Sequence, residues 1–208
     1  MWIKICGFCD TESARNALEI GVDAIGLNFV RRSKRYVSVE RARDVADIVR
    51  GKVEIVGVVE DLSLEEINEL RNGLGLDRIQ IHGNAVGLDI TRWPTWAYRA
   101  VGLAVAEDVH QLDHGSGDRV LVDTSIGGKS GGTGAVFDWT WVIDAAKHCR
   151  LVLAGGLSPA NVQGAIQVVQ PFGVDVAGGV ERLGEPRSKD PELMRLFVQR
   201  ARDAANAS

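Results

Sequence analysis

The stretch WIKICGFCDTESARNALEIG, at residues 2–21, carries the pattern that decides the fold. It begins with a short apolar run, Trp2–Cys6, whose composition favours a buried strand. A helical pattern over Thr11–Ile20 follows it and stops at Gly21, a residue type that commonly ends helices. A strand that leads directly into a helix is the repeating unit of parallel α/β sheets.

The same unit recurs along the rest of the chain. Seven further strands are predicted at Ala24–Val30, Glu54–Val59, Arg78–His82, Trp96–Val101, Arg119–Asp123, Leu151–Leu153 and Gly173–Val176. Helices are predicted over Val39–Arg50, from Ser63, over Asn84–Arg92, Glu107–Asp113 and Phe137–His148, from Ser158-Pro159, and from Asp190-Pro191 to about Ala204. Several helices have clear start signals, among them a capping box and proline at the first helical position.

Eight strands that alternate with helices predict a closed (β/α)8 barrel, the TIM barrel fold. The 208 residues allow about 26 per unit, near the minimum for a strand and a helix. We therefore expect a single α/β domain over residues 1–208, compact and with short loops. A doubly wound open sheet is the alternative, but such a sheet usually has fewer strands.

Composition and charge narrow the possible functions. Acidic residues number 28 and basic ones 24, the opposite of the balance expected for a protein that grips nucleic acid. No run approaches the roughly 18 apolar residues of a membrane span, and no signal peptide is visible at the N-terminus. With three cysteines, an odd number, a disulfide scaffold is not expected, so we predict a cytoplasmic protein.

Polar side chains gather at the predicted C-terminal ends of the strands, where such barrels carry their active sites. The candidates are Cys6, Arg35, Gln80, His82, Asp123 and Asp175. A cysteine can act as a general base when nearby positive charge lowers its pKa, and an aspartic acid can act as a general acid when burial raises its pKa. A buried packing cysteine and a helix-capping aspartate are the alternative for each residue taken alone.

Three glycine clusters follow the last strands and predict a phosphate site, because backbone N–H groups in such loops can converge on an anion. They are Gly132-Thr133-Gly134, Gly155-Gly156 and Gly178-Gly179. The alternative is that these glycines only permit tight turns.

Two other motifs are weaker. Gly128-Lys129-Ser130 resembles the end of a nucleotide-binding P-loop, but that motif needs glycine at position 123, which is aspartate. Cys6 and Cys9 form a single C-x-x-C with no second pair to complete a zinc site, and we expect neither a metal nor a cofactor.

The ordered set of motifs along the whole chain resembles the phosphoribosylanthranilate isomerases of tryptophan biosynthesis. The motifs are Lys4-Ile5-Cys6-Gly7, Ser33-Lys34-Arg35-Tyr36-Val37, Gln80-Ile81-His82-Gly83, Gly131-Gly132-Thr133-Gly134, Phe137-Asp138-Trp139, Leu153-Ala154-Gly155-Gly156-Leu157, Asn161-Val162, Gly173-Val174-Asp175-Val176, Gly179-Val180-Glu181 and Lys189-Asp190.

The resemblance implies a cofactor-free Amadori rearrangement of N-(5'-phosphoribosyl)anthranilate, an aldose–ketose isomerisation. By the same resemblance, Asp123 is the general acid, Cys6 the general base, and Arg35 the partner of the anthranilate carboxylate, while Asp175 helps to hold the substrate. His82 and Gln80 line the mouth without an assigned role. The expected partner is this small phosphorylated substrate, and the protein is expected to be a monomer or homodimer.

The sequence departs from the family pattern after the last strand, where Ala177-Gly178-Gly179 replaces the usual Ser-Ser-Gly. Two hydroxyl groups that could contact phosphate are therefore missing, although the backbone N–H groups remain. Two other functions stay open. A sugar-phosphate lyase or synthase would need a lysine at a strand end, and Lys4 lies inside its strand; a non-catalytic barrel could bind a phosphorylated metabolite.

Overall fold

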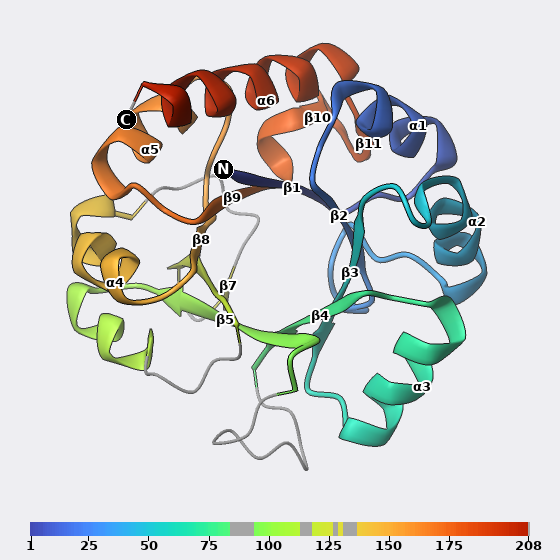
Figure 1. The fold of residues 1–208 in the computed structure, drawn as a ribbon. Coiled ribbons are helices and arrows are strands. Elements are labelled where there is room, and N and C mark those ends of the chain that lie inside the picture. The colour runs from blue at the N-terminus through green and yellow to red at the C-terminus, as the bar shows by residue number, and fades with distance from the viewer. Residues whose placement is uncertain (84–93, 113–117, 127–128, 131–136, 208) are drawn as a thin grey trace.

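The computed structural model describes residues 1–83, 94–112, 118–126, 129–130 and 137–207, and it confirms the predicted barrel (Figure 1). Eight parallel strands of this described part pair in the closed order β1-β2-β3-β4-β5-β6-β8-β9 and back to β1. They are β1 (Trp2–Cys6), β2 (Ala24–Asn28), β3 (Glu54–Glu60), β4 (Arg78–His82), β5 (Ala97–Leu103), β6 (Val120–Ile126), β8 (Leu151–Leu153) and β9 (Gly173–Val176).

The helices form a ring outside the strands. They are α1 (Thr11–Ile20), α2 (Val39–Val49), α3 (Leu64–Leu74), α4 (Ile143–His148), α5 (Val162–Val169) and α6 (Pro191–Asn206), with 3-10 helices η1 (Ala106–Leu112), η2 (Trp139–Val142) and η3 (Gly178–Val180). The predicted capping box is confirmed at Ser63 and Glu66, and the predicted start at Asp190-Pro191 is confirmed as well. Asp138 caps η2 by accepting a hydrogen bond from the Thr140 N–H. In the described residues, no helix is both long and apolar enough to cross a membrane.

Several features differ from the prediction, among them the bounds of β2, β3, β5 and β6 and the 3-10 character of η1. The helix expected from Ser158-Pro159 begins only at Val162, because the Ser158 N–H donates to Asn161 Oδ1 and makes this segment a turn. Two short antiparallel pairings were not predicted: β7 (Lys129–Ser130) on β6, and a hairpin of β10 (Glu181–Arg182) with β11 (Glu185–Lys189). The helix expected over Asn84–Arg92 lies outside the described residues.

Side chains alternate between two cores along each strand, as a period of two requires. Ile3 and Ile5 of β1 belong to the large core between strands and helices. The barrel interior has a smaller core, which Trp2 joins and which consists of Ala24, Val56, Tyr98, Ala100, Leu121, Val152 and Ala154. Lys4 and Cys6 have the same parity as Trp2, so they too point into the barrel.

Candidate active site

The predicted polar residues lie at one end of the barrel, at or just beyond the C-terminal ends of the strands. Cys6 ends β1, His82 ends β4, and Asp175 lies in β9. Asp123 lies in β6, and Arg35 follows β2. Because parallel strands all end on the same side of a barrel, the fold brings together residues that are far apart in the sequence.

A buried polar network joins several of these groups, and its centre is Lys4. The Lys4 ammonium is fully buried and donates hydrogen bonds to Asp175 Oδ2 at 2.7 Å and to Gln80 Oε1 at 2.9 Å. Tyr98 donates its hydroxyl to the same Gln80 oxygen at 3.1 Å. Sequence reasoning missed Lys4 and Tyr98 as site residues, although the shared parity of Lys4 and Cys6 is a signal that could have found Lys4.

His82 extends this network toward the barrel mouth. Its Nε2 lies 2.8 Å from Gln80 Nε2, so the glutamine amide can donate to a neutral imidazole. Loss of solvation and the nearby charge of Lys4 lower the pKa of His82 to about 4. His82 is therefore neutral at pH 7 and acts as a hydrogen-bonding group rather than as a charge.

One carboxylate oxygen of Asp175 accepts a hydrogen bond, and the other has no partner among the described residues. Its carboxylate is only 8% exposed, and Oδ2 pairs with Lys4. Oδ1 is buried and has no hydrogen-bond partner among the described residues. A buried acceptor without a partner is costly, so this oxygen is well suited to accept a hydrogen bond from a bound ligand.

Cys6 occupies a tight position opposite Gly26 of β2. The two residues pair in register, and a Cβ at position 26 would lie 2.6 Å from the Cys6 sulfur, so glycine is needed there. Burial raises the pKa of the Cys6 thiol above its ordinary value, while the positive charges of Lys4, Lys189 and Arg35 act in the opposite direction. The free protein thus holds a thiol whose ionisation depends on the cations around it.

Asp123 has the pKa that a general acid needs near neutrality. Loss of solvation, reinforced by the negative charge of Asp175, raises the pKa of its carboxyl group to about 7, against the hydrogen bond that it accepts from Thr124 N–H. Gly155 allows this packing, because a Cβ there would lie 2.8 Å from Asp123 Oδ1. A proton is therefore available on Asp123 near neutral pH.

Arg35 is buried and held by a residue that sequence reasoning did not assign to the site. Its Nε and Nη2 donate to the two carboxylate oxygens of Glu181 at 2.5 and 2.9 Å. Lys189 donates to Glu181 at 3.1 Å and to the Ala177 carbonyl, also at 3.1 Å. Since a guanidinium has five N–H groups, the edge of Arg35 formed by Nη1 and Nη2 can still receive a carboxylate.

The turn after β9 packs closely against the segment that follows the two glycines after β8. Gly155 and Gly156 adopt positive φ angles of 84° and 66°, and a Cβ on Gly179 would lie 2.1 Å from the Leu157 carbonyl oxygen. Among the backbone–backbone hydrogen bonds that the described residues form outside helices and strands, none is donated by the N–H of Gly155 or Gly156. The third predicted cluster, Gly132-Thr133-Gly134, lies outside those residues.

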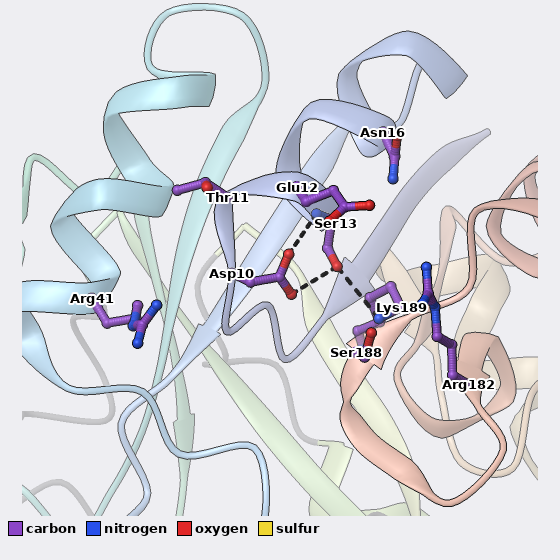
Figure 2. Close-up of a pocket in the computed structure, with 9 residues that line it drawn as sticks. All are labelled: Asp10, Thr11, Glu12, Ser13, Asn16, Arg41, Arg182, Ser188 and Lys189. Carbon is purple, nitrogen blue, oxygen red and sulfur yellow. Dashed lines mark hydrogen bonds between the residues drawn. The ribbon is translucent and has the colours of Figure 1, made fainter.

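A cavity of about 290 Å³ lies beside this site, between the start of α1, α2 and the β10–β11 hairpin (Figure 2). Its polar wall is already engaged: Asp10 accepts hydrogen bonds from the Ser13 N–H and hydroxyl, and Ser13 Oγ accepts one from Lys189 N–H. These bonds tie the hairpin to α1 and so fix Lys189 next to Glu181.

The three cysteines are free thiols, and Cys9 lies near the carbonyl oxygens of Gly7 and Arg35. The part of the chain that the structure describes contains no group of three or more His, Cys, Asp or Glu side chains that could hold a metal ion.

Fold and site together define a (β/α)8-barrel protein with titratable groups at the C-terminal ends of its strands and two glycine turns beside them. The chain belongs to the N-(5'-phosphoribosyl)anthranilate (PRA) isomerase family, whose sequence model matches residues 3–200. The resemblance and the isomerase function predicted from the sequence are thereby confirmed.

Individual relatives are similar to this chain over nearly its full length. The N-(5'-phosphoribosyl)anthranilate isomerase of Thermotoga neapolitana is 38% identical over 203 residues, which cover 96% of this chain and 98% of that protein. The phosphoribosyl anthranilate isomerase of Thermotoga maritima has a similar solved structure, with a TM-score of 0.84, 34% identity and coverage of 98% and 99%. A further solved phosphoribosyl anthranilate isomerase, in complex with reduced 1-(o-carboxyphenylamino)-1-deoxyribulose 5-phosphate, has a TM-score of 0.80, 32% identity and the same coverage.

Proposed function

We propose that this chain converts N-(5'-phosphoribosyl)anthranilate into 1-(2-carboxyphenylamino)-1-deoxyribulose 5-phosphate, an aldose–ketose isomerisation in tryptophan biosynthesis that needs no cofactor. One observation supports this most. Cys6 and Asp123 lie on β1 and β6, toward the same end of the barrel, and the charges of Lys4, Asp175 and Arg35 shift the pKa of both groups, so a candidate base and a candidate acid share one site. A pair of this kind suits a reaction made of proton transfers.

Asp123 acts first, as the general acid. It gives its proton to the furanose ring oxygen, the bond between that oxygen and C1 breaks, and the anthranilate nitrogen supplies the electron pair for a C1 iminium ion. The raised pKa of Asp123, about 7, keeps this proton available at neutral pH.

Cys6 acts second, as the general base. Its thiolate removes the proton from C2, and the electron pair of that C–H bond moves toward the iminium nitrogen to form an enolamine. Tautomerisation of the enolamine then gives the ketone. The iminium is the electron sink, which is why these steps need no external redox partner.

Substrate binding uses the groups around this pair. The free edge of Arg35 pairs with the anthranilate carboxylate, and the unpaired Asp175 Oδ1 accepts a hydrogen bond from a sugar hydroxyl. The N–H groups of Gly155, Gly156, Gly178 and Gly179 bind the phosphate, joined by the Gly132-Thr133-Gly134 segment. A cytoplasmic location and a monomeric or homodimeric state remain predictions.

A direct assay tests the proposal. Purified protein and freshly prepared N-(5'-phosphoribosyl)anthranilate are mixed in the presence of a metal chelator, and the loss of substrate fluorescence is followed while the ketone product is identified by mass. We expect turnover with and without the chelator. A folded wild-type protein that binds a reduced product analogue without turning over substrate would instead indicate a non-catalytic binding barrel.

A further inference from the structure

The Lys4 ammonium is the feature that the proposed steps leave unused. It lies inside the barrel with no exposed surface, where an unpaired charge would be very costly. Its position is set by the fold, because Lys4 and Asp175 are register partners across β1 and β9. A lysine at this depth is present at a substantial desolvation cost, which an apolar side chain would avoid.

The contacts of Lys4 reach two of the groups that face the substrate. It engages Asp175 through Oδ2 alone, which leaves Oδ1 without a protein partner. It also engages Gln80 through Oε1, which turns the Gln80 amide nitrogen toward His82. Removing the ammonium would leave Asp175 Oδ2 without this partner and would leave Gln80 Oε1 with only the hydrogen bond from Tyr98.

Lys4 lies two residues before Cys6, on the same face of β1. The other cations around Cys6 are Lys189 and Arg35, and both of them bind the Glu181 carboxylate. Asp175 and Asp123 supply the negative charges on the facing strands β9 and β6, and the buried Tyr98 hydroxyl lies on β5. Among these charges Lys4 lowers the pKa of Cys6 the most.

We propose that Lys4 is a positioning residue for this site, which holds Asp175 and Gln80 in their observed orientation and places its ammonium on the same face of β1 as the Cys6 sulfur. The inference rests on the proposed role of Cys6 as base. Lys4 is not a Schiff-base nucleophile in this proposal, because its nitrogen is charged and donates hydrogen bonds to two oxygen acceptors.

The test measures thiolate absorbance in the far ultraviolet as a function of pH, with the Cys6→Ser variant subtracted so that the signal comes from Cys6. Lys4→Met is expected to raise the ionisation midpoint of Cys6 by about one unit or more, the usual size of a close charge effect. Lys4→Arg keeps the charge and should keep the midpoint near that of the wild type. The measurement needs no substrate, so its failure is distinct from a failure of the isomerase assay.

A second variant covers the case in which Lys4→Met does not fold. Lys4→Met combined with Asp175→Leu replaces the buried ion pair by apolar side chains, a change that proteins often tolerate. Lys4 changes the pKa of Cys6 more strongly than Asp175 does. The ionisation midpoint of Cys6 should therefore still rise in the double variant, although by less than in Lys4→Met. A folded Lys4→Met or double variant with the wild-type midpoint would overturn the proposal.

Discussion

The two ends of the barrel both contain buried charges, but they arrange them differently. At the N-terminal ends of the strands, Arg119 pairs with Glu54 at 3.0 Å and its guanidinium lies over the rings of Trp2 and Phe172. Arg78 pairs with the same Glu54 at 3.3 Å. At the C-terminal ends, Asp175 keeps an oxygen without a partner, and Cys6 and Asp123 have raised pKa values.

The N-terminal end of the barrel therefore stabilises the fold, and the C-terminal end carries the reactive groups. The N-terminal end matches each arginine with a carboxylate and covers the pair with aromatic rings, as expected of a structural element. At the C-terminal end, Asp175 Oδ1 has no hydrogen-bond partner and Asp123 is held near its midpoint at pH 7, which is costly for folding but useful for proton transfer. Arg119 Nε and Asp118 Oδ1 at the N-terminal end also lack a hydrogen bond, but they face each other as an ion pair at 3.4 Å. Substitutions at the two ends should therefore change different measured quantities.

The largest effect is expected from Cys6→Ser and Asp123→Asn at the C-terminal end. Each removes one proton-transfer group, so kcat should fall about 10²- to 10⁴-fold in the fluorescence assay while the melting temperature changes little. Cys9→Ser is the matched control, because this thiol lies three residues further on and should leave kcat within a few-fold of the wild type. Activity that survives both catalytic substitutions would contradict the mechanism.

Arg119→Met tests the opposite end. Loss of the guanidinium leaves Glu54 with Arg78 as its remaining ion-pair partner and takes the cation away from the aromatic rings. We expect a loss of about 2 kcal/mol in the free energy of unfolding, measured by denaturant titration. The kcat/KM of the remaining folded protein should stay close to that of the wild type. Arg150→Met is the control: this arginine is half exposed, so less than about 1 kcal/mol should be lost. An equal loss in both variants would argue against a specific role of Arg119.

The pH profile sharpens the description of the C-terminal end. The active form needs a protonated Asp123 and an ionised Cys6; below about pH 7 both groups are protonated, and above the raised pKa of Cys6 both have lost their protons. We therefore expect kcat/KM to rise with pH up to about pH 7 and to fall at alkaline pH. On each limb of the profile, kcat/KM should change by about tenfold per pH unit. A profile that is flat below pH 7, in enzyme shown to stay folded there, would contradict this assignment.

The smallest effect is expected from Arg35→Lys. Lysine cannot make two parallel hydrogen bonds to a carboxylate, so the KM for substrate should increase by about tenfold or less, with a smaller change in kcat. Arg32→Lys is the control from the same loop, because Arg32 is exposed and pairs with Glu60 instead. A KM that increases equally in both variants would indicate a general charge effect rather than a contact of Arg35.

The local pattern of the sequence was sufficient for most of the fold. β1, β4, β8 and β9 have the predicted bounds, because a short apolar run between a glycine or a turn and a helix has few other conformations. The β10–β11 hairpin was missed, since Glu181–Lys189 lacks the alternation of apolar and polar residues that marks strands. The turn at Ser158 was missed because Asn161 competes for its N–H, a side-chain contact that propensities do not include.

The sequence by itself determined the eight barrel strands, the family, and the residues Cys6, Asp123, Arg35 and Asp175 as candidates at or after strand ends. Only the tertiary structure decided how those candidates are held. Lys4 meets Asp175 across 171 positions of the chain, and Arg35 meets Glu181 across 146. Closure of the barrel makes these contacts, and burial then sets the pKa values, so neither can be read from a local pattern of residues.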